Sequence, residues 1–120
     1  PVYYDEHGHL VGLEAVIDKD FAAEKLAETI DADILLILTA VENVKINFKK
    51  ENEEDLKILT ADEAFKYIAR GEFAAGSMLP KIEAGISFVS SGKNRTCIIT
   101  NPENAINAID GKTGTKIIGE

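Results

Sequence analysis

One stretch decides the fold, Ala15-Val16-Ile17-Asp18-Lys19-Asp20-Phe21-Ala22-Ala23, in which an apolar run ends in three charged residues and passes directly into a helical pattern. This order predicts a strand that turns into a helix, with the charges in the turn. Ligands of open α/β sheets bind beyond the carboxyl ends of strands, and a helix that begins there offers unpaired N–H groups suited to phosphate. The alternative is that Asp18 or Asp20 caps the helix and Lys19 lies in solvent, a common way for a helix to start.

The residues that follow extend this turn into a βαβ unit from Val16 to Thr39. The helix is expected over residues 19–30 and to lie on a sheet. Residues 34–39 form an uninterrupted apolar run, which is the pattern of a central parallel strand covered on both faces. The expected inner face of the helix comprises Phe21, Ala22, Leu26 and Ile30, and the expected outer face comprises Glu24, Lys25 and Glu28.

Two pairs of short strands are predicted outside this unit. Residues 2–4 and 10–13 flank a polar interval with Gly8, which fits a β-hairpin or a short excursion between strands. His7 and His9 in that interval are expected to be exposed turn residues, because no Cys or His partner for a metal lies nearby. Residues 44–48 alternate as a strand, and residues 56–59 are a candidate partner across the charged, solvated loop 49–55.

Two longer helices have clear boundaries. Thr60-Ala61-Asp62-Glu63 is a capping box that opens a helix through Arg70, and Gly71 ends it. A second helix has Pro80 in its first turn and stops at residues 90–92. The remaining predicted elements are a strand from Thr96 to Thr100, a short helix from Asn101 to Asp110 and a last strand over Lys116-Ile117-Ile118.

Lys81 falls in the first turn of the second helix, where the positive end of the helix dipole disfavours a cation. The cost is a few tenths of a kcal/mol to about 1 kcal/mol, unless an anion is shared between the lysine and the helix N-terminus. Two interpretations stay open. Either Lys81 helps to bind an anion, or it extends into solvent.

Composition limits the function classes. The chain has 120 residues, of which 45% are hydrophobic, enough for one globular domain. A net charge of −8 argues against a general nucleic-acid surface, which needs clustered Lys and Arg. No apolar run approaches the roughly 18 residues of a membrane span, and no signal peptide is evident. The single cysteine, Cys97, permits no internal disulfide, so a cytoplasmic location is expected. The absence of an initiator Met suggests a segment of a longer protein.

Known short motifs give little support to other chemistries. Gly111-Lys112-Thr113-Gly114-Thr115 is no P-loop, because it lacks the upstream glycine and leads into a strand. The sequence contains no GxGxxG, CxxC, HExxH or GxSxG element. What remains is a layered α/β domain with Lys19 and Lys81 at helix N-termini and two aspartates beside the first. Such a set suits phosphoryl transfer, in which the protein positions groups and neutralises charge.

Several blocks, in order and with matching spacing, resemble the C-terminal part of the carbamate kinase family within the amino acid kinase superfamily. The blocks are Val16-Ile17-Asp18-Lys19-Asp20-Phe21-Ala22-Ala23, Ile37-Leu38-Thr39-Ala40-Val41, Ile46-Asn47-Phe48, Gly71-Glu72-Phe73, Gly76-Ser77-Met78-Leu79-Pro80-Lys81 with Glu83-Ala84, and Gly111-Lys112-Thr113-Gly114-Thr115. The resemblance implies a three-layer α/β sandwich with a mainly parallel central sheet and a β-hairpin excursion.

The resemblance also implies an activity: ATP plus carbamate gives ADP plus carbamoyl phosphate, reversibly, with Mg²⁺, in a cytoplasmic homodimer of arginine metabolism. The N-terminal part of such kinases carries the glycine-rich loops and the acceptor site, and that part is missing here. The resemblance therefore implies that this chain is a single ATP/ADP-binding domain, which binds nucleotide without turnover when alone.

The matched blocks imply roles for individual residues. Lys19 and Lys81 resemble the lysines that neutralise the transferring phosphoryl group, and Asp20 resembles the carboxylate that orients them. Lys45 departs from the aromatic residue expected at its position. No protein ligand for a metal is predicted. The residues expected to bind nucleotide are Asp18, Thr39, Ala40, Val41, Val44, Asn47, Gly76, Ser77, Met78 and Lys81.

Two other functions are compatible with the residues. One is a non-catalytic regulatory α/β domain that holds a metal or phosphate with paired aspartates and a distant lysine, as receiver domains do. Against it, the strand over residues 34–38 ends in Thr39-Ala40, where a receiver would place its phospho-acceptor aspartate. The other is a fragment that dimerises through the surface left open by its missing half.

Overall fold

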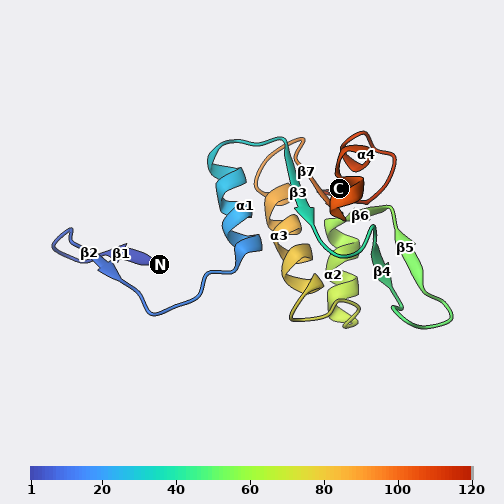
Figure 1. Cartoon of the computed structure of the whole chain (residues 1–120), viewed down its shortest axis with the longest axis horizontal. Coiled ribbons are helices and arrows are strands. Elements are labelled where there is room, and N and C mark those ends of the chain that lie inside the picture. Colours follow the sequence, from blue (N-terminus) through green and yellow to red (C-terminus); the bar gives the residue numbers. More distant parts are fainter. Residues whose placement is uncertain (120) are drawn as a thin grey trace.

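A four-stranded sheet with the order β3-β7-β8-β6 lies at the centre of the computed structural model, which describes residues 1–119 (Figure 1). β3 (Ile34–Leu38) runs parallel to β7 (Thr96–Thr100), and β6 (Ile58–Thr60) runs parallel to β8 (Thr115–Ile118). β7 and β8 pair in antiparallel fashion. The sheet is therefore mixed but mainly parallel, which confirms the prediction.

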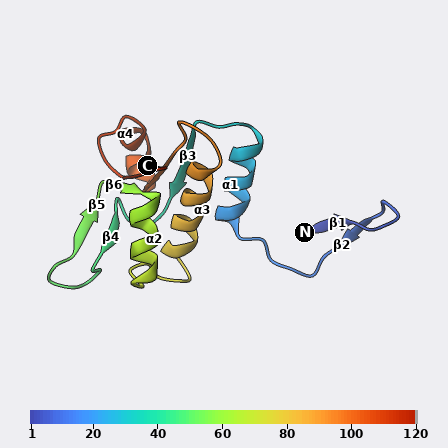
Figure 2. The ribbon, with the colours of Figure 1, turned by 180° about the vertical axis from the view of Figure 1, so that it is seen from behind.

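Helices cover both faces of this sheet, in a three-layer α/β sandwich as predicted (Figures 1 and 2). Successive strand residues point to opposite faces. In β7, Cys97 lies beside Gly85 of α3. Thr100 points to the other face and lies beside Gly114, as does Ala108 of α4. The first layer contains α1 (Lys19–Thr29), α2 (Ala61–Ala69) and α3 (Met78–Ser90), and the second contains the 3-10 helix η1 (Pro102–Asn104) and α4 (Ala105–Ile109).

The core lies between α3 and the sheet. A Cβ atom at Gly85 would lie 2.7 Å from Ile117 Cδ1, so glycine allows α3 to approach β8 this closely. Phe88 and Ile82 on α3 have no exposed surface. The largest fully buried apolar side chains in this core are Phe88, Leu59, Ile82, Ile99 and Ile117.

Helix boundaries follow local chemistry. The capping box before α2 is formed, since Thr60 Oγ1 accepts from the Glu63 N–H at 3.2 Å and Glu63 Oε2 accepts from the Thr60 N–H at 3.0 Å. Gly71 follows α2 with a φ of 72°, a left-handed conformation that glycine adopts readily. Pro80 lies in the first turn of α3 as predicted. None of the helices in the described part of the chain has the length and apolar character needed to cross a membrane.

An antiparallel hairpin of β1 (Val2–Tyr4) and β2 (Leu10–Gly12) projects from the body as an arm (Figures 1 and 2). This pairing confirms the hairpin interpretation of the N-terminal segment. His7 and His9 are exposed in its turn, as expected. The arm makes the molecule elongated, with principal extents of 57 × 28 × 28 Å.

A second hairpin, of β4 (Val44–Ile46) and β5 (Glu54–Leu56), lies outside the central sheet. The predicted partner strand over residues 56–59 is only partly correct, because Leu56 pairs with Val44 while residues 58–59 belong to β6. The charged residues of β5 were expected in a loop. They tolerate a strand because Lys45 faces Asp55 across the pair and forms an ion pair with it.

The predicted strand before α1 is not formed, so the βαβ unit from Val16 to Thr39 is wrong in its first element. Residues 14–18 are a connection without a strand partner. Val16 and Ile17 are 98% and 60% exposed. An extended segment becomes a strand only when a neighbour pairs with its backbone, and among residues 1–119 none does.

The predicted inner face of α1 is also wrong. Glu24 is fully buried, and Asp20 and Ala27 are buried beside it. The apolar residues Leu26 and Ile30 are instead 61% and 66% exposed. The physical reason is that α1 packs on α3 and β3 through its Asp20, Glu24 and Ala27 side, so its apolar stripe points away from the described body.

β3 lies at the edge of the described sheet, so the prediction of a central strand is wrong. Leu35 and Ile37 are buried, whereas Ile34 and Leu38 are each 44% exposed. The apolar run is that of a strand covered on both sides. Among the described residues, β7 is the only strand that pairs with it.

Candidate functional site

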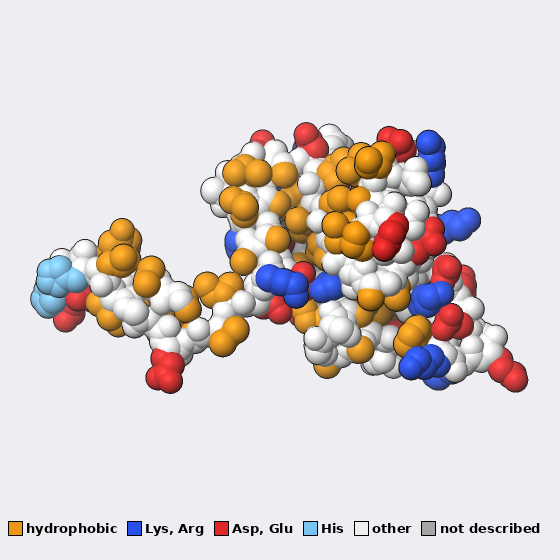
Figure 3. Space-filling model, viewed as in Figure 1, with side chains coloured by type: hydrophobic (Ala, Val, Ile, Leu, Met, Phe, Trp, Pro, Cys, Tyr) orange, Lys and Arg blue, Asp and Glu red, His pale blue; other side chains and the backbone are white. Residues whose placement is uncertain are grey.

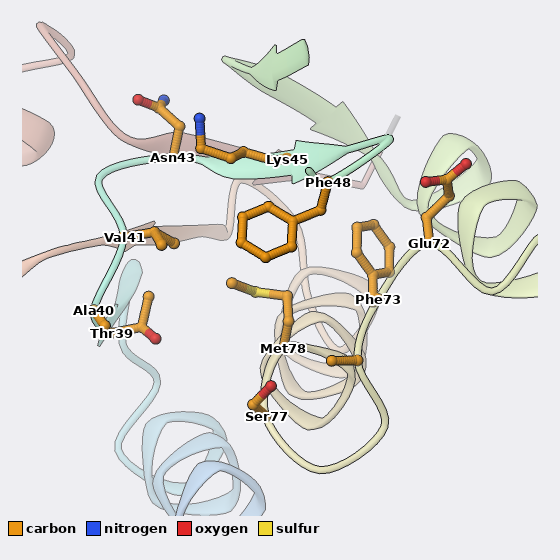
Figure 4. Close-up of a pocket in the computed structure, with 11 residues that line it drawn as sticks. Thr39, Ala40, Val41, Asn43, Lys45, Phe48, Glu72, Phe73, Ser77 and Met78 are labelled. Atoms are coloured by element: carbon orange, nitrogen blue, oxygen red, sulfur yellow. The ribbon is translucent and has the colours of Figure 1, made fainter. Parts of the chain in front are cut away.

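A pocket of about 280 Å³ lies between the segment that follows β3 and the segment that leads into α3 (Figure 4). The first segment contributes Thr39, Ala40, Val41, Asn43, Lys45 and Phe48, and the second contributes Glu72, Phe73, Ala74, Ser77 and Met78. The pocket therefore joins two stretches of chain that are about thirty residues apart in the sequence.

One part of the pocket is an apolar slot. Figure 4 shows the Phe48 ring and the Met78 thioether facing the same space, with Phe73 beside them. Phe73 is buried and packs edge-on against Tyr67, whereas Phe48 is 52% exposed and forms the rim. Aromatic and thioether groups in this arrangement accommodate a flat ring. The slot therefore has the shape and chemistry to hold a planar heterocycle.

The other part of the pocket is polar. Thr39 and Ser77 lie on the side away from Phe48 (Figure 4). Ser77 is the N-cap residue of α3, yet its side chain makes no capping hydrogen bond. In the first turn of α3 the Leu79 N–H donates to the Ala74 carbonyl at 3.0 Å and Pro80 has no N–H, so this end offers mainly the positive end of the helix dipole. This end of the pocket is therefore suited to an anionic group.

Lys81 lies one turn into α3 and forms a buried ion pair with Asp20 of α1. Its Nζ atom is 2.9 Å from Asp20 Oδ2, and each residue is 8% exposed. Met78 and Lys81 are three residues apart on the helix and are therefore neighbours on its surface. Lys81 thus does not extend into solvent. The anion that offsets its unfavourable position in the first turn is Asp20, which the sequence placed beside Lys19.

Asp18 has a different task, because it is the N-cap of α1. Its Oδ1 atom accepts from the Asp20 N–H at 2.8 Å and from the Phe21 N–H at 3.3 Å. The capping alternative is therefore the one observed, and the first amides of α1 are already occupied. Lys19 is exposed and forms no ion pair within residues 1–119. The three charged residues of the turn thus have three tasks: Asp18 caps α1, Lys19 is an exposed cation, and Asp20 is the buried partner of Lys81.

The residues at this site do not suit a protein-bound metal. The carboxylates of Asp18 and Asp20 are engaged in the cap and the ion pair. Among the described residues, no group of three His, Cys, Asp or Glu side chains is placed to hold a metal ion. Burial, with a smaller contribution from the charge of Asp20, raises the pKa of Cys97 to about 12, so this thiol stays neutral.

The structure brings part of the predicted nucleotide site together. Val44 is fully buried behind the pocket wall. Asn47 and Gly76 adjoin lining residues without belonging to the lining. The residues of the prediction that line the pocket are Thr39, Ala40, Val41, Ser77 and Met78, and those that lie outside the lining are Asp18, Lys19, Asp20, Val44, Asn47, Gly76 and Lys81.

Sequence reasoning missed the aromatic half of the pocket. Phe48 and Phe73 stand in the recognised blocks 46–48 and 71–73, and their identity as aromatic residues was the only available signal. Lys45 lines the pocket, but its ammonium group is paired with carboxylates of the 53–55 region. The other lining residues that were missed are Asn43, Glu72 and Ala74.

Comparisons with known proteins give one consistent family. A model of the amino acid kinase family matches residues 2–101. Carbamate kinase 2 from Staphylococcus aureus (strain bovine RF122 / ET3-1) is 58% identical over 106 residues, which cover 88% of this chain and 34% of that protein. Carbamate kinase from Clostridium perfringens (strain 13 / Type A) is 54% identical over 114 residues, which cover 95% of this chain and 36% of that protein.

Similarity in structure agrees with similarity in sequence. A solved structure of carbamate kinase from Giardia lamblia bound to AMP-PNP matches with a TM-score of 0.90 and 42% sequence identity. The match covers 97% of this chain and 36% of that chain. This chain therefore spans about a third of the length of the carbamate kinases that it resembles.

Proposed function

Because this chain belongs to the amino acid kinase family, we propose that it supplies the nucleotide site of a carbamate kinase. The reaction proposed is the reversible transfer of a phosphoryl group between ATP and carbamate, which gives ADP and carbamoyl phosphate. One observation carries the proposal: a largely apolar pocket opens beside the N-terminus of α3, one turn from the buried Lys81–Asp20 pair.

The base of the nucleotide occupies the apolar slot in this proposal. Phe48 and Met78 offer two apolar surfaces to a flat ring, and Val41 lies on the opposite wall (Figure 4). The phosphates extend toward Ser77 and the first turn of α3, where the hydroxyl of Ser77 and the positive end of the helix dipole favour negative charge. This orientation carries the terminal phosphate from the slot toward Lys81.

Lys81 is proposed as the positive charge that stabilises the phosphoryl group in transit. In phosphoryl transfer, charge is spread over the equatorial oxygens of the moving group, and the protein acts mainly by positioning cations near them. Asp20 holds the Lys81 ammonium in a fixed place, so no side-chain reorganisation is needed when the substrate arrives. Lys19 is exposed without an ion-pair partner in the described residues and is proposed as a second cation for the phosphates.

The carbamate site and the glycine-rich loops are proposed to lie in the part of the enzyme outside this chain, and the complete enzyme is proposed to be a homodimer. Mg²⁺ is implied by the family, but the carboxylates of Asp18 and Asp20 are engaged and do not fit as its ligands. We therefore assign no step to a metal bound by these residues. The chain by itself is expected to bind ADP without catalysing turnover.

Calorimetric titration of the 120-residue chain with ADP tests the proposal. The wild-type chain is expected to bind, and Lys81→Ala is expected to weaken binding by about tenfold, because an interaction of a charged group with phosphate is lost. Lys93→Ala is the matched control, since Lys93 is an exposed lysine beyond the opposite end of α3. A folded wild-type chain that binds no ADP would overturn the proposal.

The catalytic role of Lys81 is tested in a complete carbamate kinase that carries this segment. Lys81→Ala is expected to lower kcat by a larger factor than it weakens ADP binding, since an interaction made in the transition state is removed. Equal factors in both quantities would reduce Lys81 to a nucleotide-binding residue. A fully active variant would refute both roles.

A further inference from the structure

The pocket wall formed by residues 39–48 is anchored by a side chain from the other end of the chain. Thr115, the first residue of β8, has no exposed surface. Its hydroxyl accepts a hydrogen bond from the Val44 N–H at 2.8 Å and donates one to the Leu56 carbonyl. Val44 and Leu56 are paired residues of β4 and β5. One hydroxyl therefore fixes both strands of the outer hairpin to the central sheet.

Two less buried attachments hold the ends of the same wall. The Glu72 carboxylate accepts from the Asn47 N–H at 2.8 Å, and Asn47 has a φ of 53° at the point where the chain leaves β4. At the other end, the exposed Thr113 hydroxyl donates to the Glu42 carboxylate. Of these attachments, only the one at Thr115 is fully buried, so water cannot replace it easily.

The attachment at Val44 controls which side chains face the pocket. Successive residues of a strand point to opposite sides. Val44 points into the core and is fully buried, and its neighbours Asn43 and Lys45 line the pocket. Phe48 continues the same wall after β4. A shift of the hairpin relative to β8 would therefore displace the polar rim and the aromatic edge of the pocket together.

We propose that Thr115 is a positioning residue for nucleotide binding: its hydroxyl sets the place of the β4–β5 hairpin, and through it the wall formed by residues 39–48. This inference rests on the proposed function, because it assumes that the nucleotide occupies this pocket. A two-stranded hairpin with strands of three residues holds its position poorly without an outside anchor. Without the hydroxyl, the buried Val44 N–H and the Leu56 carbonyl would each lose a hydrogen bond to β8.

Thr100 provides a matched control within the same sheet. It is also a threonine without exposed surface, at the end of β7. Its hydroxyl makes no hydrogen bond to any described residue. Thr100→Val therefore removes the same atom as Thr115→Val, from a site of equal burial, without removing an attachment.

The experiment measures ADP affinity and amide hydrogen exchange for Thr115→Val, Thr115→Ser, Thr100→Val and the wild-type chain. Thr115→Val is expected to bind ADP about fivefold more weakly, because it removes both hydrogen bonds that hold the β4–β5 hairpin on β8. Thr115→Ser keeps the hydroxyl and is expected to restore most of the affinity, and Thr100→Val is expected to leave it unchanged. Exchange of the Val44 amide should accelerate in Thr115→Val alone, while that of Ile99, in β7, stays the same.

Three results would overturn the inference. The first is unchanged ADP affinity in Thr115→Val despite faster exchange at Val44. The second is equal acceleration at Val44 and Ile99, which would indicate a general loss of stability. The third is equal weakening by Thr115→Val and Thr100→Val. Failure of the proposed function is distinguishable, because a folded wild-type chain without ADP affinity would remove both proposals, whereas these results arise only when the wild-type chain binds.

Discussion

The part of the molecule around β4, β6 and α3 buries apolar side chains against neighbouring elements, whereas the arm, α1 and the outer edge of β3 leave several of theirs in solvent. On the covered side, Val44 and Leu59 are fully buried. On the open side, Val16, Leu26 and Ile30 are 98%, 61% and 66% exposed, and Figure 3 shows hydrophobic side chains along the arm. The two sides do not differ in how apolar their sequences are. They differ in whether a neighbouring element lies against them.

This difference teaches how a sequence pattern relates to burial. The apolar stripe of α1 has the spacing of a helix face that is packed, and the apolar run of β3 is that of a strand covered on both faces. The spacing identifies the surface that must be covered, and the covering element has to come from elsewhere. In the proposed function, that element belongs to the remainder of the kinase. The comparison can be tested by substitutions on each side.

The largest expected effect is on the covered side. Phe88→Ala is expected to lower the free energy of unfolding by about 3–5 kcal/mol, since Phe88 is fully buried and its removal leaves a cavity. Ile30→Ala, a large-to-small change on α1 at 66% exposure, is the control and should cost less than about 1 kcal/mol. Urea denaturation followed by circular dichroism measures both. Similar losses for the two variants would show that the two sides are equally packed.

A smaller effect, of opposite sign, is expected at Glu24, the fully buried carboxyl that α1 turns toward the body. Its two oxygens make no hydrogen bond within the described residues, and Lys25 Nζ lies 3.4 Å away. Burial, followed by the nearby Glu28 carboxylate, raises the pKa of Glu24. Glu24→Gln is therefore expected to stabilise the chain by about 1 kcal/mol at pH 7, because an ionised buried group is removed.

The pH dependence gives the sign of this effect independently. A folded-state pKa above the ordinary value of 4.5 means that the contribution of Glu24 is fully present below pH 4.5 and is lost as the pH rises through the raised pKa. The advantage of Glu24→Gln should therefore shrink as the pH is lowered from 7 toward 4.5. Glu83→Gln, at an exposed position of α3, is the control. An advantage that stayed constant with pH would assign the effect to packing.

Local chemistry made much of the fold predictable. The Thr60–Glu63 box, the break at Gly71 and the Pro80 turn each depend on residues within a few positions of one another, and all three were located from the sequence. The strands over 34–38 and 96–100 were recognised from their apolar runs. At α1 the wrong face was expected to be buried, and β3 was expected at the centre of the sheet. Both errors arose because periodicity contains no information about the neighbouring element.

The candidate site divides in the same way. Thr39, Ser77 and Met78 belong to recognised blocks and line the pocket. The contact of Lys81 with Asp20 spans 61 residues, and that of Thr115 with Val44 spans 71 residues. No local rule of capping, turn or spacing pairs residues so far apart. The family resemblance implied that Asp20 orients Lys81, whereas the contact of Thr115 with Val44 became visible only when the sheet had brought the separate segments together.

The smallest effect on stability is expected on the open side, where it sharpens the comparison most. Leu26→Lys places a charge on the apolar stripe of α1, at a position that is 61% exposed. In the 120-residue chain it should change the free energy of unfolding by no more than about 0.5 kcal/mol, because no described residue packs against it.

In a complete carbamate kinase that carries this segment, the same change is expected to lower the Tm by several degrees, since a lysine would be buried without a partner. Ala23→Lys, which adds the same charge at another exposed position of α1, is the control for a general effect on the helix. If Leu26→Lys left the Tm of the complete enzyme unchanged, the stripe would be a solvent-facing surface in the whole protein as well. The exposure of α1 would then be a property of this helix and not the mark of an absent neighbour.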